Sequence, residues 1–307
     1  MDVLTTQENF LSNTENKMRF ITMLTEKFLT SGILVRQAED DADLLIVNTA
    51  IRNTDDNVQV VVIGEDIDLL ILLLTLSPPK NTIIFEKLGR GKIETRSYAV
   101  VSLQEHFKNE IQYFMFIHAI GGCDSTSALF QQGKIKHLKI VQKHPELHDS
   151  LLVFNNESSS PEEIERAGEK YLFTLYKAPA HITLYKKQVQ LARLPPTIDA
   201  AREHLHRIYL QIQLWRGNKL DPQNWSWKEY NGKLNPVFTK NSPAPDTLFM
   251  LCSVIWKHCQ GGSCLNQQPI IDDEEEDNFE EYIDEINLIE NQKEETNTPT
   301  IKKNLPT

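Results

Sequence analysis

The sequence predicts an α/β fold in which a mostly parallel sheet is flanked by helices. Strand-like apolar segments alternate with helical segments over residues 33–122, an order typical of parallel sheets covered by helices on both faces. The segment "VQVVVIG" at residues 58–64 is apolar almost throughout, as in a strand that is buried on both faces. The chain has 307 residues, 40% hydrophobic and 24% charged, which is enough to bury the core of one main domain with extensions.

The first elements of this sheet follow one another along the chain. Residues 1–32 predict a helical lead-in that ends at a glycine, and "ILVRQ" at 33–37 predicts a short strand. "AEDDADLLIVNTAIRN" at 38–53 predicts a helix with acids in its first turn, where the helix dipole favours them. The strand at 58–64 ends in a glycine, and "EDIDLLILLLTL" at 65–76 predicts a buried helix that two prolines stop.

The rest of the chain divides into the end of this domain, an extension and a tail. "TIIFEKL" and "TRSYAVVS" predict two more strands, and the helices that follow complete one α/β domain over residues 1–145. Residues 146–270 predict an α-helical and irregular extension, with capped helices at "SSSPEEIERAGEKYLFTLY" and "PPTIDAAREHLHRIYLQIQLW". Residues 271–307 predict a disordered acidic tail, because 13 of the 43 acids but only 3 of the 32 basic residues fall there.

Charge and cysteine content argue against several classes of protein. The formal net charge is −11, but the tail carries most of it, so only a local basic patch could attract nucleic acid. The four cysteines are too few for a disulfide framework. No segment has the pattern of a secretion signal or a membrane span. We expect an intracellular protein, nuclear or cytoplasmic, that is neither secreted nor inserted in a membrane.

Carboxylates follow the apolar segments at three separate points of the chain. These acids are Glu39, Asp41 and Asp43, then Glu65, Asp66 and Asp68, and finally Asp124 in "FIHAIGGCDSTS". Because functional sites of parallel sheets lie at the carboxyl ends of the strands, we expect these side chains to meet in one crevice. Like charges this close do not all stay ionised unaided. Mg²⁺ or Mn²⁺, which prefer carboxylate oxygens, would stabilise them, and one or two such ions suit phosphodiester hydrolysis.

A simpler interpretation of the same acids stays open. Asp and Glu are common at helix N-termini, so "GED" and "QAEDD" fit the starts of two ordinary helices. Capping alone does not explain why acids follow apolar segments at all three points.

A short basic segment after Asp124 predicts contacts to phosphate. The residues concerned are Lys134, Lys136, His137 and Lys139. A helix that begins here adds backbone N–H donors. The alternative is that "GKIKHLKIVQKH" is the solvated face of an amphipathic helix.

The other candidate sites have weaker sequence signals. Cys252, Cys259 and Cys264 lack the tight spacing of a zinc knuckle, so we do not expect zinc. His118 in "FMFIHAIGG" predicts a satisfied core histidine, and the tryptophans, among them Trp215, predict packing rather than base stacking.

Three segments also carry a resemblance to a known family. "AEDDADLLIV", "VIGEDIDLLILL" and "FIHAIGGCDSTSALFQQGK" resemble the PIN-like, flap-endonuclease superfamily. Over about residues 10–265 the chain resembles more closely a transposon-like group of animal proteins that carry this domain, on "NKMRFITML", "GCDSTSALFQQGK", "AGEKYLFTLY" and "LPPTIDAAREHLHRIYLQIQLW".

The resemblance implies a PIN-like, Rossmann-like domain over residues 1–145 with a two-metal nuclease site. The catalytic carboxylates it implies are Asp66, Asp68, Asp124 and Asp41, and Glu39 and Asp43 would be further metal ligands. The implied substrate is nucleic acid, and we expect DNA rather than RNA. The superfamily has a further metal-binding Asp on a first strand that this sequence lacks, so we expect an N-terminally truncated domain that a partner protein or a missing segment completes. A catalytically inactive binding or scaffold protein is the alternative.

Overall fold

The structure is a computed structural model that divides into two compact units, residues 1–45 and 46–307. It describes residues 6–39, 41–54, 58–80, 82–89, 91, 94–176, 195–240 and 283. The predicted tail, except Ile283, and the three cysteines of the possible zinc site lie outside the described residues. No helix within the described ranges combines the length and apolar composition that crossing a membrane requires.

The N-terminal unit confirms the predicted helical lead-in but not the strand that was expected to follow. It contains α1 (Gln7–Ser12) and α2 (Thr14–Thr30), and the side chain of Asn13 caps α2 by accepting from two backbone N–H groups. Residues 33–37 form no strand, and Ile33 and Leu34 are 52% and 79% exposed. A β-branched segment forms a strand only where a neighbouring strand and a packed face stabilise it, and the structure pairs no strand with this segment.

The sheet of the second unit is mixed rather than mostly parallel. Its strands are β1 (Val60–Ile63), β2 (Ile83–Lys87) and β3 (Arg96–Ala99), in that spatial order. β1 and β2 are parallel, whereas β2 and β3 are antiparallel. The chain from β1 to β2 passes through α4 (Ile67–Leu76), which gives the crossover that a parallel pair needs. Only residues 88–95 join β2 to β3, which is too short for a crossover, so the chain reverses.

One face of the sheet is packed and the other is open at β1. Val62, Phe85 and Tyr98 are buried on the packed face, and the Phe85 and Tyr98 rings lie 6.0 Å apart between centroids. Val61 and Ile63 alternate with Val62 and are 47% and 59% exposed. The prediction that this strand is buried on both faces is therefore wrong, because β1 is an edge strand whose second face lacks a covering layer among the described residues.

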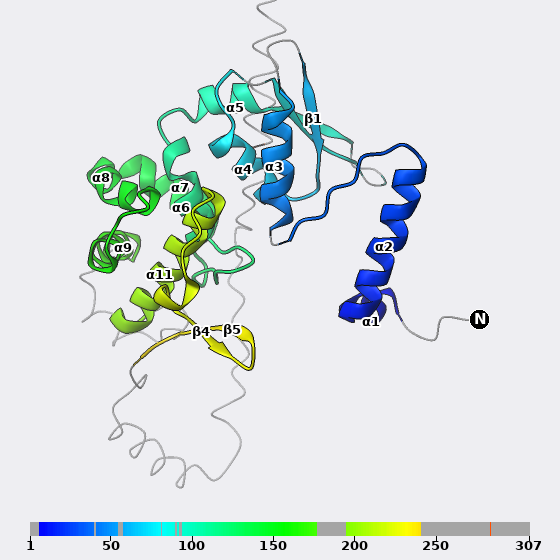
Figure 1. Ribbon diagram of the computed structural model, residues 1–307. Helices are drawn as coiled ribbons and strands as arrows, with labels where there is room; N and C mark the ends of the chain where they lie inside the picture. Colours follow the sequence, from blue (N-terminus) through cyan, green and yellow to red (C-terminus); the bar gives the residue numbers. More distant parts are fainter. Residues whose placement is uncertain are drawn as a thin grey trace, which may run out of the picture. The chain divides into compact units, whose positions relative to one another are not determined.

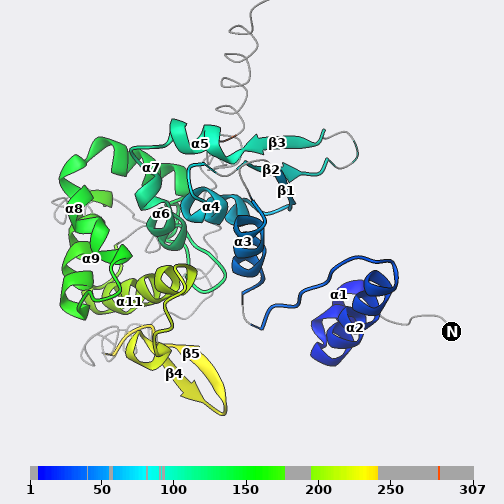
Figure 2. The same cartoon turned by 45° about the horizontal axis from the view of Figure 1, so that its top comes forward.

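The remaining elements are mostly helical, and Figures 1 and 2 show α8 and α9 at the end of this unit that lies farther from β1, β2 and β3. The helices are α3 (Ala42–Arg52), α5 (Val100–His106), α6 (Phe114–Ile120), α7 (Lys134–Lys143), α8 (His148–Leu151), α9 (Pro161–Leu175) and α11 (Ile198–Trp215). The 3₁₀ turns are η1 (Ile111–Tyr113), η2 (Pro145–Leu147), η3 (Leu152–Asn155) and η5 (Pro222–Asn224), and a hairpin pairs β4 (Trp227–Tyr230) with β5 (Lys233–Pro236). The predicted helices at α3, α4, α9 and α11 are confirmed, whereas "TRSYAVVS" is half strand and half helix.

α6 lies at the centre of the core of this unit. All seven of its residues are buried, and α4, α7 and α11 pack against it (Figure 2). α9 then packs on α11, and both helices contribute side chains to the same apolar cluster as the sheet. The helices after residue 145 therefore share one core with the sheet.

The α9–α11 contact depends on a glycine. A Cβ atom placed on Gly168 would lie 2.3 Å from both Cδ atoms of Leu205, which is far inside van der Waals distance. Leu205 is fully buried, so the two helices have to move apart to admit a methyl group.

We expect Gly168→Ala to lower the free energy of unfolding by about 1–3 kcal/mol, because overpacking outweighs the better helix propensity of alanine. Chemical denaturation monitored by circular dichroism measures this change. Phe173→Ala is the matched control on the same helix, since its side chain is 56% exposed and its replacement should change stability by no more than about 0.5 kcal/mol. A Gly168→Ala protein as stable as the wild type would contradict this packing.

Candidate functional site

A sharp turn after β1 places two acids at the start of α4. The turn contains Gly64, where a Cβ would lie 2.8 Å from Leu69 Cδ2 and 2.9 Å from Phe85 Cε2. Only glycine lets the backbone approach these side chains so closely. Asp66 then caps α4, since its Oδ1 accepts from the backbone N–H of Asp68 at 3.1 Å. Capping thus accounts for Asp66 but leaves the carboxylate of Asp68 for other partners.

A second turn, after α6, holds Asp124. The chain leaves α6 through Gly122, whose φ of +98° is in the region that favours glycine. Cys123 and Thr126 close the turn with two backbone hydrogen bonds of 3.0 and 3.2 Å. Ser125 donates to Gln211 Oε1 on α11 at 2.6 Å. This turn is therefore fixed from both sides, and it holds Asp124 exposed to solvent.

Asp68 lies at the centre of the site and is in contact with two basic side chains. Lys134 Nζ, at the start of α7, is 3.1 Å from Asp68 Oδ1. His118 Nε2, on α6, is 3.5 Å from Asp68 Oδ2. The side chains of Asp68 and Lys134 are 21% and 18% exposed, and that of His118 is 1% exposed. Three segments far apart in the sequence therefore meet at one carboxylate.

The three acids predicted from the second strand and from "GGCDSTS" form one electrostatic cluster. Burial raises the pKa of Asp68 above its ordinary value, and the negative charges of Asp66 and Asp124 raise it further. The charge of Lys134 and its hydrogen bond lower the pKa but do not reverse the shift. Asp66 and Asp124 thus lie close enough to influence Asp68, and Lys134 supplies a positive charge beside it.

His118 is buried, as predicted, but it is not fully satisfied. Burial lowers its pKa to about 3, and the charge of Lys134 acts in the same direction. Its ring is therefore neutral near pH 7, stacked on Trp215 at 5.0 Å between centroids. The buried Nδ1 has no hydrogen-bond partner among the described residues. Nothing in the sequence connects His118 with Asp68, because no periodicity relates the two segments.

Three of the remaining predicted acids, Glu39, Asp41 and Asp43, belong to the N-terminal unit. Asp41 caps α3, since its Oδ1 accepts from the backbone N–H groups of Asp43 at 2.9 Å and Leu44 at 3.2 Å. Glu39 is exposed, and Asp43 lies in the first turn of α3. The capping interpretation therefore holds for Asp41, while the acids of the second unit form a cluster among themselves.

Of the four residues predicted to contact phosphate, two point from α7 toward the core and two are exposed to solvent. Lys134 binds Asp68, whereas Lys136 and Lys139 are exposed. His137 is fully buried: its Nε2–H donates to the Gln132 carbonyl at 2.9 Å and its Nδ1 accepts from the Tyr171 hydroxyl at 2.7 Å. The prediction that His137 contacts phosphate is therefore corrected, because the ring has no exposed surface.

The spacing along α7 contains a signal that would have revealed this division. Lys134 and His137 share a helical face with the apolar Leu138 and Val141, both of which are buried. Residues at such i, i+3, i+4 and i+7 positions lie on one side of a helix. The pattern therefore places Lys134 and His137 toward the core.

The carboxylates of the site suit a hard cation, although Lys134 already pairs with one of them, Asp68. Carboxylate oxygens are what Mg²⁺ and Mn²⁺ prefer, and Asp66, Asp68 and Asp124 supply them. Lys134 engages one oxygen of Asp68, and no group of three or more His, Cys, Asp or Glu within the described ranges has the arrangement of a preformed metal centre. A cation at these carboxylates therefore has to compete with the ammonium group.

Comparison with protein-family models, with curated proteins and with solved structures finds no match for this chain.

The raised pKa of Asp68 makes stability depend on pH. The folded protein binds the Asp68 proton more tightly than the unfolded chain does, so this carboxyl lowers the free energy of unfolding as pH rises from about 4 through its folded pKa. We expect Asp68→Asn to raise the melting temperature at pH 7, and we expect the difference from wild type to vanish near pH ~3, where the carboxyl is protonated in both states.

Scanning calorimetry at the two pH values measures this effect. Asp66→Asn is the control, because asparagine caps a helix about as well as aspartate, so its melting temperature should stay close to that of the wild type. A lower melting temperature of Asp68→Asn at pH 7 would show that the Lys134 pair outweighs the cost of burial.

Proposed function

We propose that the protein hydrolyses phosphodiester bonds of nucleic acid with the help of Mg²⁺ or Mn²⁺, as a PIN-like nuclease. The observation that carries this proposal is the cluster of Asp66, Asp68 and Asp124, in which both neighbours raise the pKa of a half-buried Asp68. Side chains whose pKa values are shifted by burial and by neighbouring charges are common at functional sites. The resemblance in the three acidic segments supports the same reaction.

Each residue of the cluster has a separate task in this proposal. Asp66, Asp68 and Asp124 hold the cation, which supplies Lewis acidity and positive charge at a phosphate oxygen when it is bound. Lys134 neutralises Asp68 in the absence of the cation and, once displaced, is a donor for a phosphate oxygen. The exposed Lys139 binds the nucleic-acid backbone at the outer face of α7. Without a cation, three carboxylates against one lysine would repel a phosphodiester.

A nuclease assay on flap DNA, single-stranded DNA and RNA, with Mg²⁺ or Mn²⁺, tests the proposed reaction. We expect Asp66→Asn combined with Asp68→Asn to lower the cleavage rate about 100-fold or more, since even outer residues of metal sites cost about 10–100-fold. Asn at residue 66 keeps the cap of α4, so the variant should stay folded.

The matched control is Asp149→Asn, an exposed acid at the start of α8, which should cleave at the wild-type rate. Equal cleavage by the wild type and the double variant would assign the activity to a contaminant and end the enzyme proposal.

The Lys134–Asp68 ion pair favours a second candidate, a nucleic-acid-binding protein without hydrolysis. In this case Lys134 is a permanent substitute for a cation, and the exposed face of α7 retains the binding function. Wild-type protein would then bind labelled DNA in EDTA and leave it intact with Mg²⁺ or Mn²⁺.

Both candidates use the exposed face of α7, and Lys139→Glu tests it. We expect this variant to bind DNA about 3–10-fold more weakly and to reduce the salt dependence by about one phosphate contact. Fluorescence anisotropy over a series of salt concentrations measures both effects. Lys228→Glu, an equal charge change on the exposed strand β4, is the control, and an equal loss of affinity in the two variants would show that only net charge matters.

A further inference from the structure

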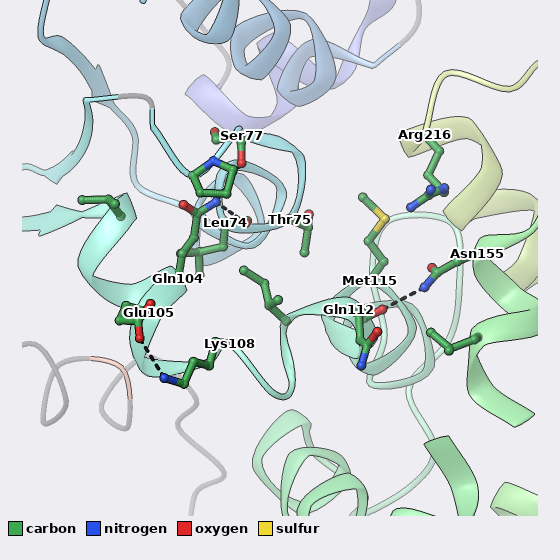
Figure 3. A pocket seen from close by; sticks show the side chains of 14 residues that line it. Leu74, Thr75, Ser77, Gln104, Glu105, Lys108, Gln112, Met115, Asn155 and Arg216 are labelled. Atoms are coloured by element: carbon green, nitrogen blue, oxygen red, sulfur yellow. Dashed lines mark hydrogen bonds and ion pairs between the residues drawn. The ribbon is translucent and has the colours of Figure 1, made fainter. Parts of the chain in front are cut away.

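The second unit contains a cavity that is separate from the acid cluster. Its volume is about 610 Å³, and side chains from α4, α5, η1, α6, η3 and the end of α11 line it (Figure 3). This volume is within the range of small-molecule sites, roughly 300–1,000 Å³. The wall includes Leu74 and Thr75 in the last turn of α4, whereas Asp68 is in its first turn, about 10 Å away along the helix axis.

Apolar side chains form much of the wall of the cavity. Leu74 and Met115 are 1% and 3% exposed and belong to the core. Ile111 packs partly buried between them and the surface. Val101 and Leu152 also line the cavity and are more exposed, at 43% and 37%. A ligand in this cavity therefore contacts apolar surface with most of its body.

Amide side chains hold the wall in place. Gln104 donates to the Leu74 and Ser77 carbonyls at 2.9 and 2.8 Å, so it fixes the end of α4. Asn155 donates to the Gln112 carbonyl at 2.9 Å and ties η3 to η1 (Figure 3). Because these groups are already engaged, the cavity is preformed and little ordering is needed when a ligand binds.

Among the described residues that line the cavity, one cation has no carboxylate partner. Lys108 Nζ pairs with Glu105 Oε1 at 2.8 Å, so these two charges cancel. Arg216 follows the last residue of α11, and Figure 3 shows its guanidinium group reaching toward Met115. Among the residues that the structure describes, Arg216 has no carboxylate partner. The cavity thus combines an apolar wall with a single uncompensated positive charge.

We propose that this cavity binds a small amphiphilic monocarboxylate. The apolar body packs against Leu74, Ile111 and Met115, and the carboxylate pairs with the guanidinium group of Arg216. Arginine presents a fork of N–H donors that matches a carboxylate. A phosphate monoester dianion fits less well, because among the described lining residues no second cation without a carboxylate partner is present to pair with its second negative charge. This site is independent of the proposed hydrolysis.

Isothermal titration of the full-length protein tests the proposal, with octanoate as the probe at pH 7. We expect octanoate to bind saturably at one site, more tightly than octan-1-ol, which lacks the charge, and octylammonium, which reverses it. Arg216→Gln should weaken octanoate binding about 10-fold, because the ligand carboxylate loses its charge-assisted hydrogen bonds. The affinity for octan-1-ol should stay unchanged.

Two further variants locate the site. Val101→Trp adds a large ring to the lining of the cavity, on a residue exposed enough to tolerate it, and should abolish binding of both octanoate and octan-1-ol. Lys219→Gln, an exposed cation three residues beyond Arg216 and outside the cavity lining, should bind octanoate like the wild type. Circular dichroism verifies that each variant is folded.

The proposal is overturned if folded wild-type protein shows no saturable octanoate binding, or if octylammonium binds as tightly as octanoate. It is also overturned if Arg216→Gln or Val101→Trp retains the wild-type affinity for octanoate.

Discussion

The half-buried carboxylate of Asp68 is the constraint on which the rest of the site depends. Its ionised form loses hydration and faces the negative charges of Asp66 and Asp124. Lys134 opposes these effects at 3.1 Å, and the N-terminal turn of α4 adds the favourable end of a helix dipole. The electrostatic energy of the three carboxylates therefore remains unfavourable. A bound cation would offset it, which is why we connect the site with cation binding.

The core explains how segments so far apart converge on this carboxylate. α6 is buried on every side and carries His118 against Asp68 and Met115 against the cavity. α4 extends from the acid cluster at its first turn to the cavity at its last. Because these two helices pack directly on one another, the acid cluster and the carboxylate-binding cavity that we propose share a rigid support.

Capping residues and apolar runs predicted the helices correctly, because these signals lie within the helices themselves. The Ser160 capping box of α9 and the uninterrupted apolar run of α4 gave correct helices. The strand at residues 33–37 and the second buried face of β1 were not correct, because each depends on which segment lies alongside. A β-branched pattern is equally compatible with an exposed linker, an edge strand and a central strand until its neighbours are known.

The acids of the candidate site could be chosen from the sequence, as could Lys134, but the contacts of the basic residues with Asp68 could not. Asp66, Asp68 and Asp124 were identified because carboxylates next to apolar segments are unusual. That His118 and Lys134 meet Asp68 depends on the packing of α6 and α7, which no spacing in the chain encodes. The cavity was not predictable, since it is built from six separate elements that each follow an ordinary pattern.

Direct measurement of Mn²⁺ binding, by titration calorimetry or by electron paramagnetic resonance, tests most directly whether the acids form a cation site in competition with Lys134. The account predicts saturable binding by the wild type, tighter binding by Lys134→Met, which frees an oxygen of Asp68, and loss of binding when Asp66 and Asp68 are both asparagine. Equal Mn²⁺ binding by all three proteins would contradict it.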